Sequence, residues 1–171
     1  MMWSSDVTIG ERCQIHESVQ FFGKVIIGDD VTIHPLSLIG SQPLSADFIQ
    51  DPYPHWKPRV SGRPVIIEDG VVILCRSTVQ SGSHLKKGCL LGNYSMIGHD
   101  TVIGEGTCIH AGVHTAGHVN IGRLCVVEPE CFIGRRVNMI KRIHIGAGSI
   151  VLNDLTRKGL YYGRPAKWVR R

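Results

Sequence analysis

The amino-acid sequence predicts an all-β chain wound as a parallel β-helix, and two features of a six-residue repeat carry this prediction. An apolar residue recurs at every sixth position in two runs, and a small or β-branched residue always lies two positions before it. The first run is Ile9, Ile15, Phe21, Ile27, Ile33 and Ile39, and the second continues in steps of six from Ile67 to Val151. Because alternate residues of a strand face one side of a sheet, each hexad supplies a short strand with two inward side chains.

Three such strands close a triangular coil of eighteen residues. Coils stacked at the ~4.8 Å spacing of neighbouring strands bury both inward residues of every hexad. A glycine follows the apolar residue in many hexads, as in Ile97-Gly98, where it permits a tight turn. The twenty-one hexads of the two runs predict about seven coils within residues 1–152, and Thr115 alone places a polar side chain in the apolar slot.

Residues 41–64 interrupt the repeat, because Ile39 and Ile67 are twenty-eight positions apart, which is not a multiple of six. Five of the eight prolines lie in this segment, and proline removes donors from a strand ladder, so we expect a projecting loop. Aromatic side chains can stack on a sugar or a base, and cationic side chains can bind a diphosphate. The loop contains both kinds of residue, which favours a role in binding the acceptor. The residues expected to contact the acceptor are Tyr53, Trp56, Lys57 and Arg59. The alternative is that these side chains pack the loop onto a neighbouring subunit.

After Val151 the inward pattern stops, and residues 153–171 are expected to form a short C-terminal tail that covers the last coil. This tail is the densest basic part of a chain whose formal net charge is +5. A positive charge of this kind suits a small polyanionic ligand such as a nucleotide. The positive charge of the whole chain is too dispersed to form a nucleic-acid-binding stripe, so no nucleic-acid partner is expected.

The six cysteines form no Cys-x-x-Cys pair, and four of them, Cys13, Cys89, Cys125 and Cys131, fall on inward slots. We interpret all six as reduced structural thiols. No apolar stretch approaches the ~18 residues of a membrane span. The first residues contain no basic leader followed by an apolar run, so the expected location is the cytoplasm.

The residues able to move a proton lie in the turns after Ile97 and Thr115. Positions eighteen apart stack on one another, so Asp100 is expected beneath His118 and His99 beneath Gly117. A carboxylate orients an imidazole and raises its basicity, which makes this cluster a candidate for acid–base chemistry. The stacking leaves open which imidazole Asp100 orients. A single outward histidine is more often a plain surface residue, and His16 and His34 are also eighteen apart.

Gly98-His99-Asp100, followed by Ala116-Gly117-His118-Val119, resembles the active-site region of hexapeptide-repeat acyltransferases. That family includes the UDP-N-acetylglucosamine acyltransferase of lipid A synthesis and sugar N- and O-acetyltransferases. The resemblance implies a left-handed β-helix, with His99 as the general base and the Gly117 amide helping to hold the thioester oxyanion. It also implies a homotrimer with active sites between subunits, and the flat outer sides of a prism suit such self-association.

None of the given residues is expected to form the helical C-terminal domain of the lipid A enzyme, and the loop motif of that enzyme is not matched residue for residue. The expected donor is therefore acetyl-CoA rather than an acyl carrier protein. Similarity to the coenzyme A-contacting ends of the family implies cofactor contacts by Gly146, Ala147, Arg164 and Lys167. The implied acceptor is an amino or hydroxyl group of a sugar, which we expect to be nucleotide-linked.

Two other functions share this fold class. A gamma-class carbonic anhydrase needs three imidazoles from two subunits around zinc, two of them five positions apart, whereas His110, His114 and His118 are spaced by four. A non-catalytic β-helix would act as a scaffold or binding module. The acyltransferase interpretation requires no metal.

Overall fold

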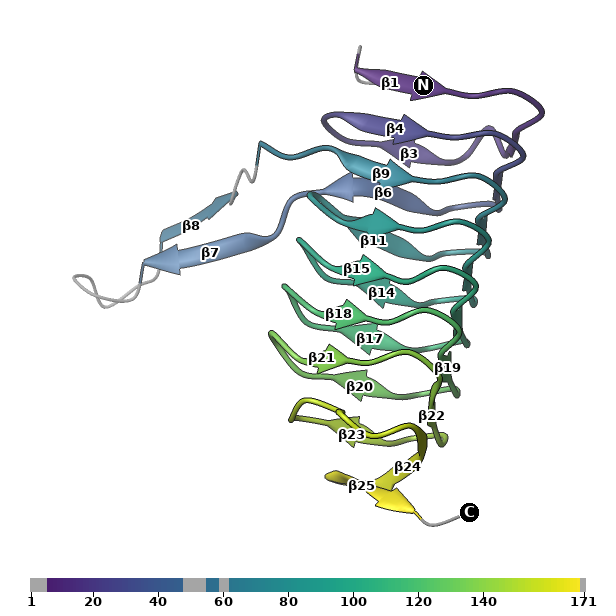
Figure 1. The fold of residues 1–171 in the computed structure, drawn as a ribbon. Coiled ribbons are helices and arrows are strands. Elements are labelled where there is room, and N and C mark those ends of the chain that lie inside the picture. The colour runs from purple at the N-terminus through teal and green to yellow at the C-terminus, as the bar shows by residue number, and fades with distance from the viewer. Residues whose placement is uncertain (1–5, 48–54, 59–61, 170–171) are drawn as a thin grey trace.

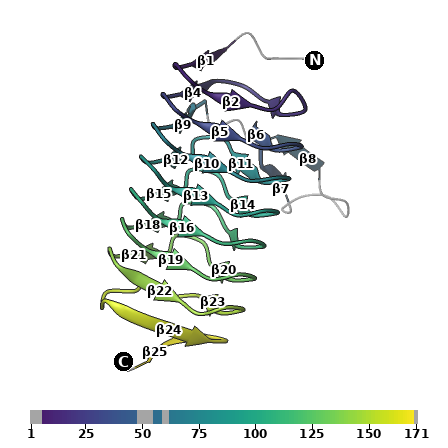
Figure 2. The ribbon, with the colours of Figure 1, turned by 90° about the vertical axis from the view of Figure 1, so that its right-hand side faces the viewer.

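The structure, a computed structural model, describes residues 6–47, 55–58 and 62–169, and only the backbone of residues 44–47 and 55–58. The described chain is a three-sided prism built from three parallel sheets, with one strand of each sheet in every coil (Figure 1). Figure 2 faces the second sheet, whose strands are stacked from the N-terminal to the C-terminal end. The described residues contain no helix that could span a membrane.

The strands of each sheet follow in chain order. The first sheet contains β1 (Val7–Ile9), β4 (Val25–Ile27), β9 (Val65–Ile67), β12 (His84–Leu85), β15 (Val102–Ile103), β18 (Asn120–Ile121) and β21 (Asn138–Met139). The second contains β2 (Gln14–Ile15), β5 (Thr32–Ile33), β10 (Val72–Ile73), β13 (Leu90–Leu91), β16 (Cys108–Ile109), β19 (Val126–Val127), β22 (Ile143–Ile145), β24 (Gly159–Gly163) and β25 (Ala166–Val169). The third contains β3 (Gln20–Phe21), β6 (Leu38–Ser41), β11 (Thr78–Gln80), β14 (Met96–Ile97), β17 (His114–Thr115), β20 (Phe132–Ile133) and β23 (Ile150–Val151).

The strand register confirms the predicted fold class. Residues eighteen positions apart pair along each sheet, as Leu85 does with Ile103. Seven complete coils result, and β24 extends the second sheet into an eighth turn, one more than the hexads indicate. The extra turn arises because Leu155 still bridges to Met139, although the hexad spacing has ended.

The core is a single column of inward side chains. The apolar slots from Phe21 to Val151 are buried, and Thr115 is buried with them. Cys89, Cys125 and Cys131 fill the smaller inward slots, and all six cysteines are free thiols. Burial raises the pKa of the Cys89 thiol to about 12, so it stays protonated near neutral pH.

The insertion leaves the prism after β6 and returns at β9. Within it, β7 (Leu44–Asp47) and β8 (His55–Pro58) pair as an antiparallel hairpin that projects from the coils (Figure 1). Across the insertion the register offset becomes forty, as in the pairing of Val25 with Val65. Of the predicted acceptor-binding residues, Tyr53 and Arg59 lie outside the described residues. Trp56 and Lys57 lie in β8, of which the structure describes only the backbone.

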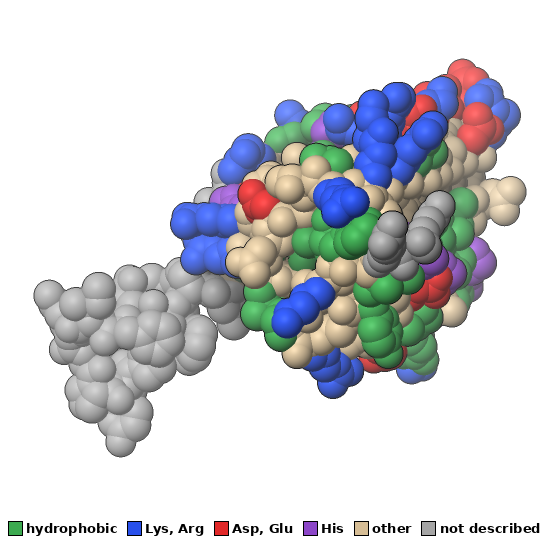
Figure 3. Space-filling model, turned by 60° about the horizontal axis from the view of Figure 1, so that its bottom comes forward, with side chains coloured by type: hydrophobic (Ala, Val, Ile, Leu, Met, Phe, Trp, Pro, Cys, Tyr) green, Lys and Arg blue, Asp and Glu red, His purple; other side chains and the backbone are tan. Residues whose placement is uncertain are grey.

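At the C-terminal end, β25 folds back antiparallel against β24. The Arg157 guanidinium lies 3.6 Å from the ring centroid of Trp168, a cation–π contact that joins β25 to the segment before β24. Trp168 Nε1 also donates a hydrogen bond to the Lys158 carbonyl at 3.2 Å. Figure 3 shows lysine and arginine side chains spread over this end of the prism, with apolar side chains between them.

Candidate active site

The candidate site lies at the third corner, which we define as the turns that leave the third sheet at residues 80–82, 98–100, 116–118 and 134–136. Backbone hydrogen bonds hold these turns in register. Asp100 N–H donates to the Ser81 carbonyl at 3.0 Å, and His118 N–H donates to the His99 carbonyl at 2.8 Å. Arg136 N–H continues the ladder to the Gly117 carbonyl at 3.1 Å. The corner therefore presents a column of side chains, one group for each coil.

His99 is paired with its own neighbour in the sequence. Its Nδ1 lies 2.8 Å from Asp100 Oδ2, and the two side chains are only 14% and 7% exposed. An ionised carboxylate can only accept hydrogen bonds, so the shared proton lies on Nδ1 and the neutral ring carries its lone pair on Nε2. His99 thus has the tautomer that a general base needs.

Asp100 is the group that stacking alone assigns to His118. The structure places His118 Nε2 at 3.9 Å from Asp100 Oδ2, beyond hydrogen-bond distance, whereas His99 is within it. The geometry therefore makes His99 the hydrogen-bond partner of Asp100. Both Asp100 and His118 have left-handed backbones, with φ of 57° and 61°, as the third turn residue does in many coils.

Gly117 lies directly over the ring of His99. A Cβ at Gly117 would collide with His99 Nε2, Cε1 and Cδ2, so only glycine leaves room for the imidazole. Within the described part of the chain, the Gly117 N–H donates no hydrogen bond. The amide of His99, at the equivalent position one coil earlier, is capped by Gln80 Oε1 at 3.1 Å. The Gly117 N–H, which donates to no described residue, and the Nε2 lone pair of His99 thus lie on adjacent coils of this corner.

Thr115, the one polar residue in an apolar slot, has a structural role. Its buried Oγ1 accepts a hydrogen bond from Gly98 N–H at 2.9 Å. In the next coil the equivalent amide donates to a backbone carbonyl instead, as Ala116 does to Ile133 at 2.8 Å. The hydroxyl therefore replaces one ladder bond immediately before His99.

His118 forms the outer wall of the site. Its ring centroid lies 4.8 Å from that of His99, with the planes at 82°, and its side chain is 30% exposed. Desolvation lowers the pKa of His118, Asp100 opposes this effect, and the positive charges of Arg135 and Arg136 lower the pKa further. Arg135 and Arg136 are exposed one coil beyond His118, so this side of the corner is positively charged.

Arg63 also reaches the site, although nothing in the sequence pattern indicated this. Its Nη2 lies 2.8 Å from Asp100 Oδ1, an ion-pair distance, although the N–H bonds are not aligned for a hydrogen bond to that oxygen. Arg63 lies at the end of the insertion, just before β9, where the period is interrupted. Counting in steps of eighteen therefore gave no signal for it.

His99, Asp100 and His118 also bring three possible metal-ligand atoms within 4.8 Å of one another. Of the possible ligand atoms of these residues, His99 Nδ1 and Asp100 Oδ2 are already hydrogen-bonded to each other. The carbonic anhydrase interpretation needs three imidazoles drawn from two subunits, two of them five positions apart, whereas the two imidazoles of this corner are nineteen positions apart.

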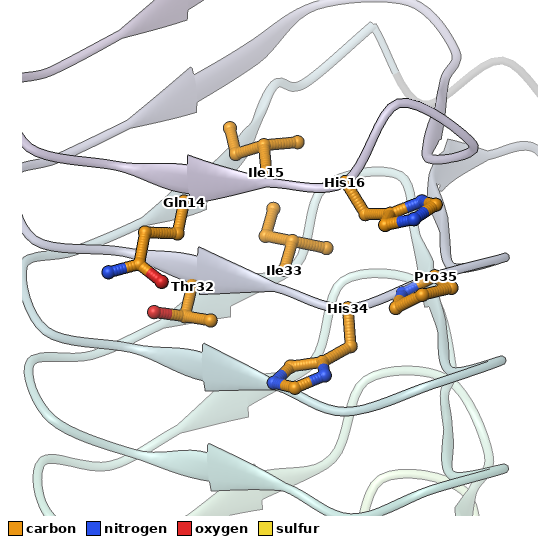
Figure 4. A pocket seen from close by; sticks show the side chains of 7 residues that line it. All are labelled: Gln14, Ile15, His16, Thr32, Ile33, His34 and Pro35. Atoms are coloured by element: carbon orange, nitrogen blue, oxygen red, sulfur yellow. The ribbon is translucent and has the colours of Figure 1, made fainter.

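His16 and His34 lie apart from this cluster. They line a shallow hollow of about 330 Å³ near the N-terminal end, between the first two coils (Figure 4). His16 Nδ1 is hydrogen-bonded to Ser18 Oγ at 2.8 Å, and no described carboxylate pairs with either ring. These two histidines form a surface ladder.

The predicted coenzyme A contacts lie at other corners. Gly146 and Ala147 follow β22 at the second corner, where the chain leaves the second sheet, and Arg164 Nε donates to the nearby Gly148 carbonyl at 2.7 Å. Lys167 lies opposite Tyr162 in the β24–β25 pair, and both cations are exposed. Within one chain, the structure does not bring these residues together with His99.

No protein-family model matches the chain. A solved UDP-N-acetylglucosamine acyltransferase is similar in structure, with 21% identity and a TM-score of 0.72 over 97% of this chain and 70% of that chain. The acetyltransferase domain of PglB from Neisseria gonorrhoeae FA1090 is 20% identical, with a TM-score of 0.59 over 88% of this chain and 57% of that chain. The same domain in complex with acetyl coenzyme A has a TM-score of 0.54 at 20% identity, over 89% of this chain and 58% of that chain.

These likenesses define the class of structure to which the chain belongs, a left-handed parallel β-helix. The chain spans less than two thirds of the length of the PglB domain. At identities of 20% and 21% the comparison shows the fold, and the chemistry is argued from the third corner itself.

Proposed function

We propose that this protein is an acyltransferase that moves an acetyl group from acetyl-CoA to an amino or hydroxyl group of a sugar. One observation carries the proposal. His99 holds its proton on Nδ1 against Asp100, and its Nε2 lies beside an amide of Gly117 that donates to none of the described residues. A base and an oxyanion donor on adjacent coils are the two groups that acyl transfer needs.

In the reaction, the acceptor nitrogen or oxygen attacks the thioester carbonyl carbon while His99 Nε2 takes its proton. The carbonyl oxygen becomes an oxyanion, which the Gly117 N–H stabilises by roughly 3 kcal/mol in comparable sites. The carbon–sulfur bond then breaks, and the imidazolium returns its proton to the coenzyme A thiolate. Asp100 stabilises the imidazolium in the interval.

The acetyl group passes directly to the acceptor, without an acyl-enzyme. Ser81, one coil before His99 at the same corner, donates its hydroxyl to Gln42 Oε1 at 3.1 Å and is not paired with the base. The buried thiols of Cys89, Cys125 and Cys131 have raised pKa values because of desolvation. The described chain therefore offers no activated nucleophile beside His99.

The donor assignment is supported by the PglB domain structure, which holds acetyl coenzyme A. We place the donor phosphates near Arg164 and Lys167, which are exposed at the C-terminal end. Removal of residues 163–171 should raise the KM for acetyl-CoA. An unchanged KM would show that the tail does not contact the donor.

We propose a homotrimer, because the base and the donor residues lie at different corners of one chain. A neighbouring subunit would bring its second corner toward the third corner of the first. The outer face of the third sheet supports this, since the exposed side chains Met96 and Phe132 flank the exposed His114 on adjacent strands. Sedimentation should give a trimer, and a monomer at micromolar concentration would contradict the assignment.

The acceptor is proposed to bind at the insertion, with Tyr53, Trp56, Lys57 and Arg59 as its contacts. The similar UDP-N-acetylglucosamine acyltransferase supports a nucleotide sugar as the acceptor. The exposed Arg135 and Arg136 suit an anionic group near the reacting atoms.

The test is thiol release from acetyl-CoA with a panel of nucleotide sugars and free amino sugars. We expect release with at least one acceptor, and its loss in a His99→Ala variant. Arg123→Ala is the matched control, because Arg123 is exposed at the corner between the first and second sheets. Release that is absent with every acceptor, or equal in His99→Ala, would favour a scaffold.

A further inference from the structure

Asp100 has two carboxylate oxygens with different partners. Oδ2 accepts the His99 Nδ1 proton at 2.8 Å, while Oδ1 is buried and receives no hydrogen bond from the described residues. The Arg63 guanidinium lies 2.8 Å from Oδ1, so it compensates the negative charge on that side. The carboxylate is thus held between two groups from distant parts of the chain.

Both partners are needed to fix the orientation of the carboxylate. A buried carboxylate oxygen that lacks a partner is costly, so Asp100 would turn toward other donors if Arg63 were removed. One alternative donor is His118 Nε2, 3.9 Å from Oδ2. A turn toward His118 would weaken the hydrogen bond that sets the tautomer of His99.

We infer that Arg63 is a positioning residue that aims the Asp100 carboxylate at His99, and through it the base at the acceptor. This inference rests on the proposed function for its effect on rate, but its structural part stands on the three side chains alone. Arg63 acts through Asp100, whose carboxylate contacts Arg63 with one oxygen and His99 with the other.

The position of Arg63 in the chain strengthens the inference. Two residues after it, Val65 N–H donates to the Lys24 carbonyl at 3.0 Å and β9 rejoins the first sheet. The backbone is therefore anchored close to Arg63. The Arg63 side chain is 65% exposed, whereas the Asp100 side chain is 7% exposed. The arginine therefore reaches from the insertion to the buried pair of Asp100 and His99.

The test compares Arg63→Ala and Arg63→Lys with the control Arg123→Ala. The first measurement is nuclear magnetic resonance of the His99 Nδ1 proton, assigned by its absence in His99→Ala. We expect a slowly exchanging resonance in the wild-type protein and in Arg123→Ala, and a broadened or missing one in Arg63→Ala. An unchanged resonance in Arg63→Ala would overturn the inference, and this readout needs no acceptor.

The second measurement uses the acceptor identified by the thiol-release screen. In Arg63→Ala, kcat should fall by about tenfold or more with the KM for acetyl-CoA unchanged, because the loss is in the base and not in donor binding. Arg63→Lys should recover part of the rate, since it restores the charge but not the guanidinium geometry. Free guanidinium ion should partly rescue Arg63→Ala and not Arg63→Lys.

The outcomes separate the inference from the proposed function. A lost resonance without any acyl transfer would support the positioning role and contradict the acyltransferase. An increase in the acceptor KM alone, with kcat and the resonance unchanged, would make Arg63 an anchor of the insertion and overturn the inference.

Discussion

The imidazole of His99 occupies the space into which a side chain at Gly117 would project. The Cβ of any other residue at position 117 would collide with Nε2, Cε1 and Cδ2 of the ring. The contact joins adjacent coils of the third corner, and it places the base beside the Gly117 amide. The relationship depends on the absence of a single methyl group.

Gly117→Ala should therefore displace the His99 ring and lower kcat by about a hundredfold, because both the base and the oxyanion donor shift. Gly134→Ala is the matched control at the same corner, since its Cβ would meet no atom closer than 3.1 Å. Steady-state kinetics with circular dichroism checks this prediction. Equal rates in the two alanine variants would show that the close approach at Gly117 has no catalytic role.

The stacking of His99 and Gly117 could be predicted from the sequence because the coil length is fixed at eighteen residues. Thr115 was also visible, as the single polar residue among the apolar slots. The hydrogen bond from Gly98 N–H to Thr115 could be found only from the structure, because either a carbonyl or a hydroxyl can accept a hydrogen bond from the amide at that point.

The partner of Asp100 could not be predicted from the sequence. Register places a turn residue over its neighbours, but the rotamer of its side chain depends on local space, and Asp100 turns to His99 in place of His118. The contact of Arg63 with Asp100 could not be predicted for a different reason. The insertion disrupts the period, so counting in steps of six or eighteen assigns no neighbour to a residue within it.

Thr115→Val should destabilise the protein by about 1–3 kcal/mol, because it leaves the buried Gly98 N–H without its acceptor. Thr115→Ser keeps the hydroxyl and should retain most of that stability. Urea denaturation of the two variants gives the comparison. If valine were as stable as serine, Gly98 would have regained a carbonyl acceptor and the hydroxyl would not hold this turn.

His118 should make stability depend on pH in a defined direction. Its pKa is lowered in the folded protein from 6.5, first by desolvation and then by nearby positive charges, so the unfolded chain binds this proton more readily. The free energy of unfolding should therefore decrease as pH falls below about 6.5 and level off below the folded pKa. Urea denaturation at several pH values should show a weaker decrease in His118→Gln than in the wild-type protein. An equal pH dependence in both proteins would contradict the assignment of the effect to His118.

His99→Ala should lower kcat by a factor of about a hundred or more, because an alcohol or ammonium group is a poor nucleophile until a positioned base takes its proton. Coenzyme A binding should be largely kept, since His99 contacts the reacting atoms and not the nucleotide. His118→Ala should cost less, because His118 Nε2 lies 3.9 Å from Asp100 and the carboxylate does not orient it. Turnover measured beside coenzyme A titration distinguishes the two roles. The reverse order of effects would assign the base to His118, and near-wild-type turnover in both variants would rule out this mechanism.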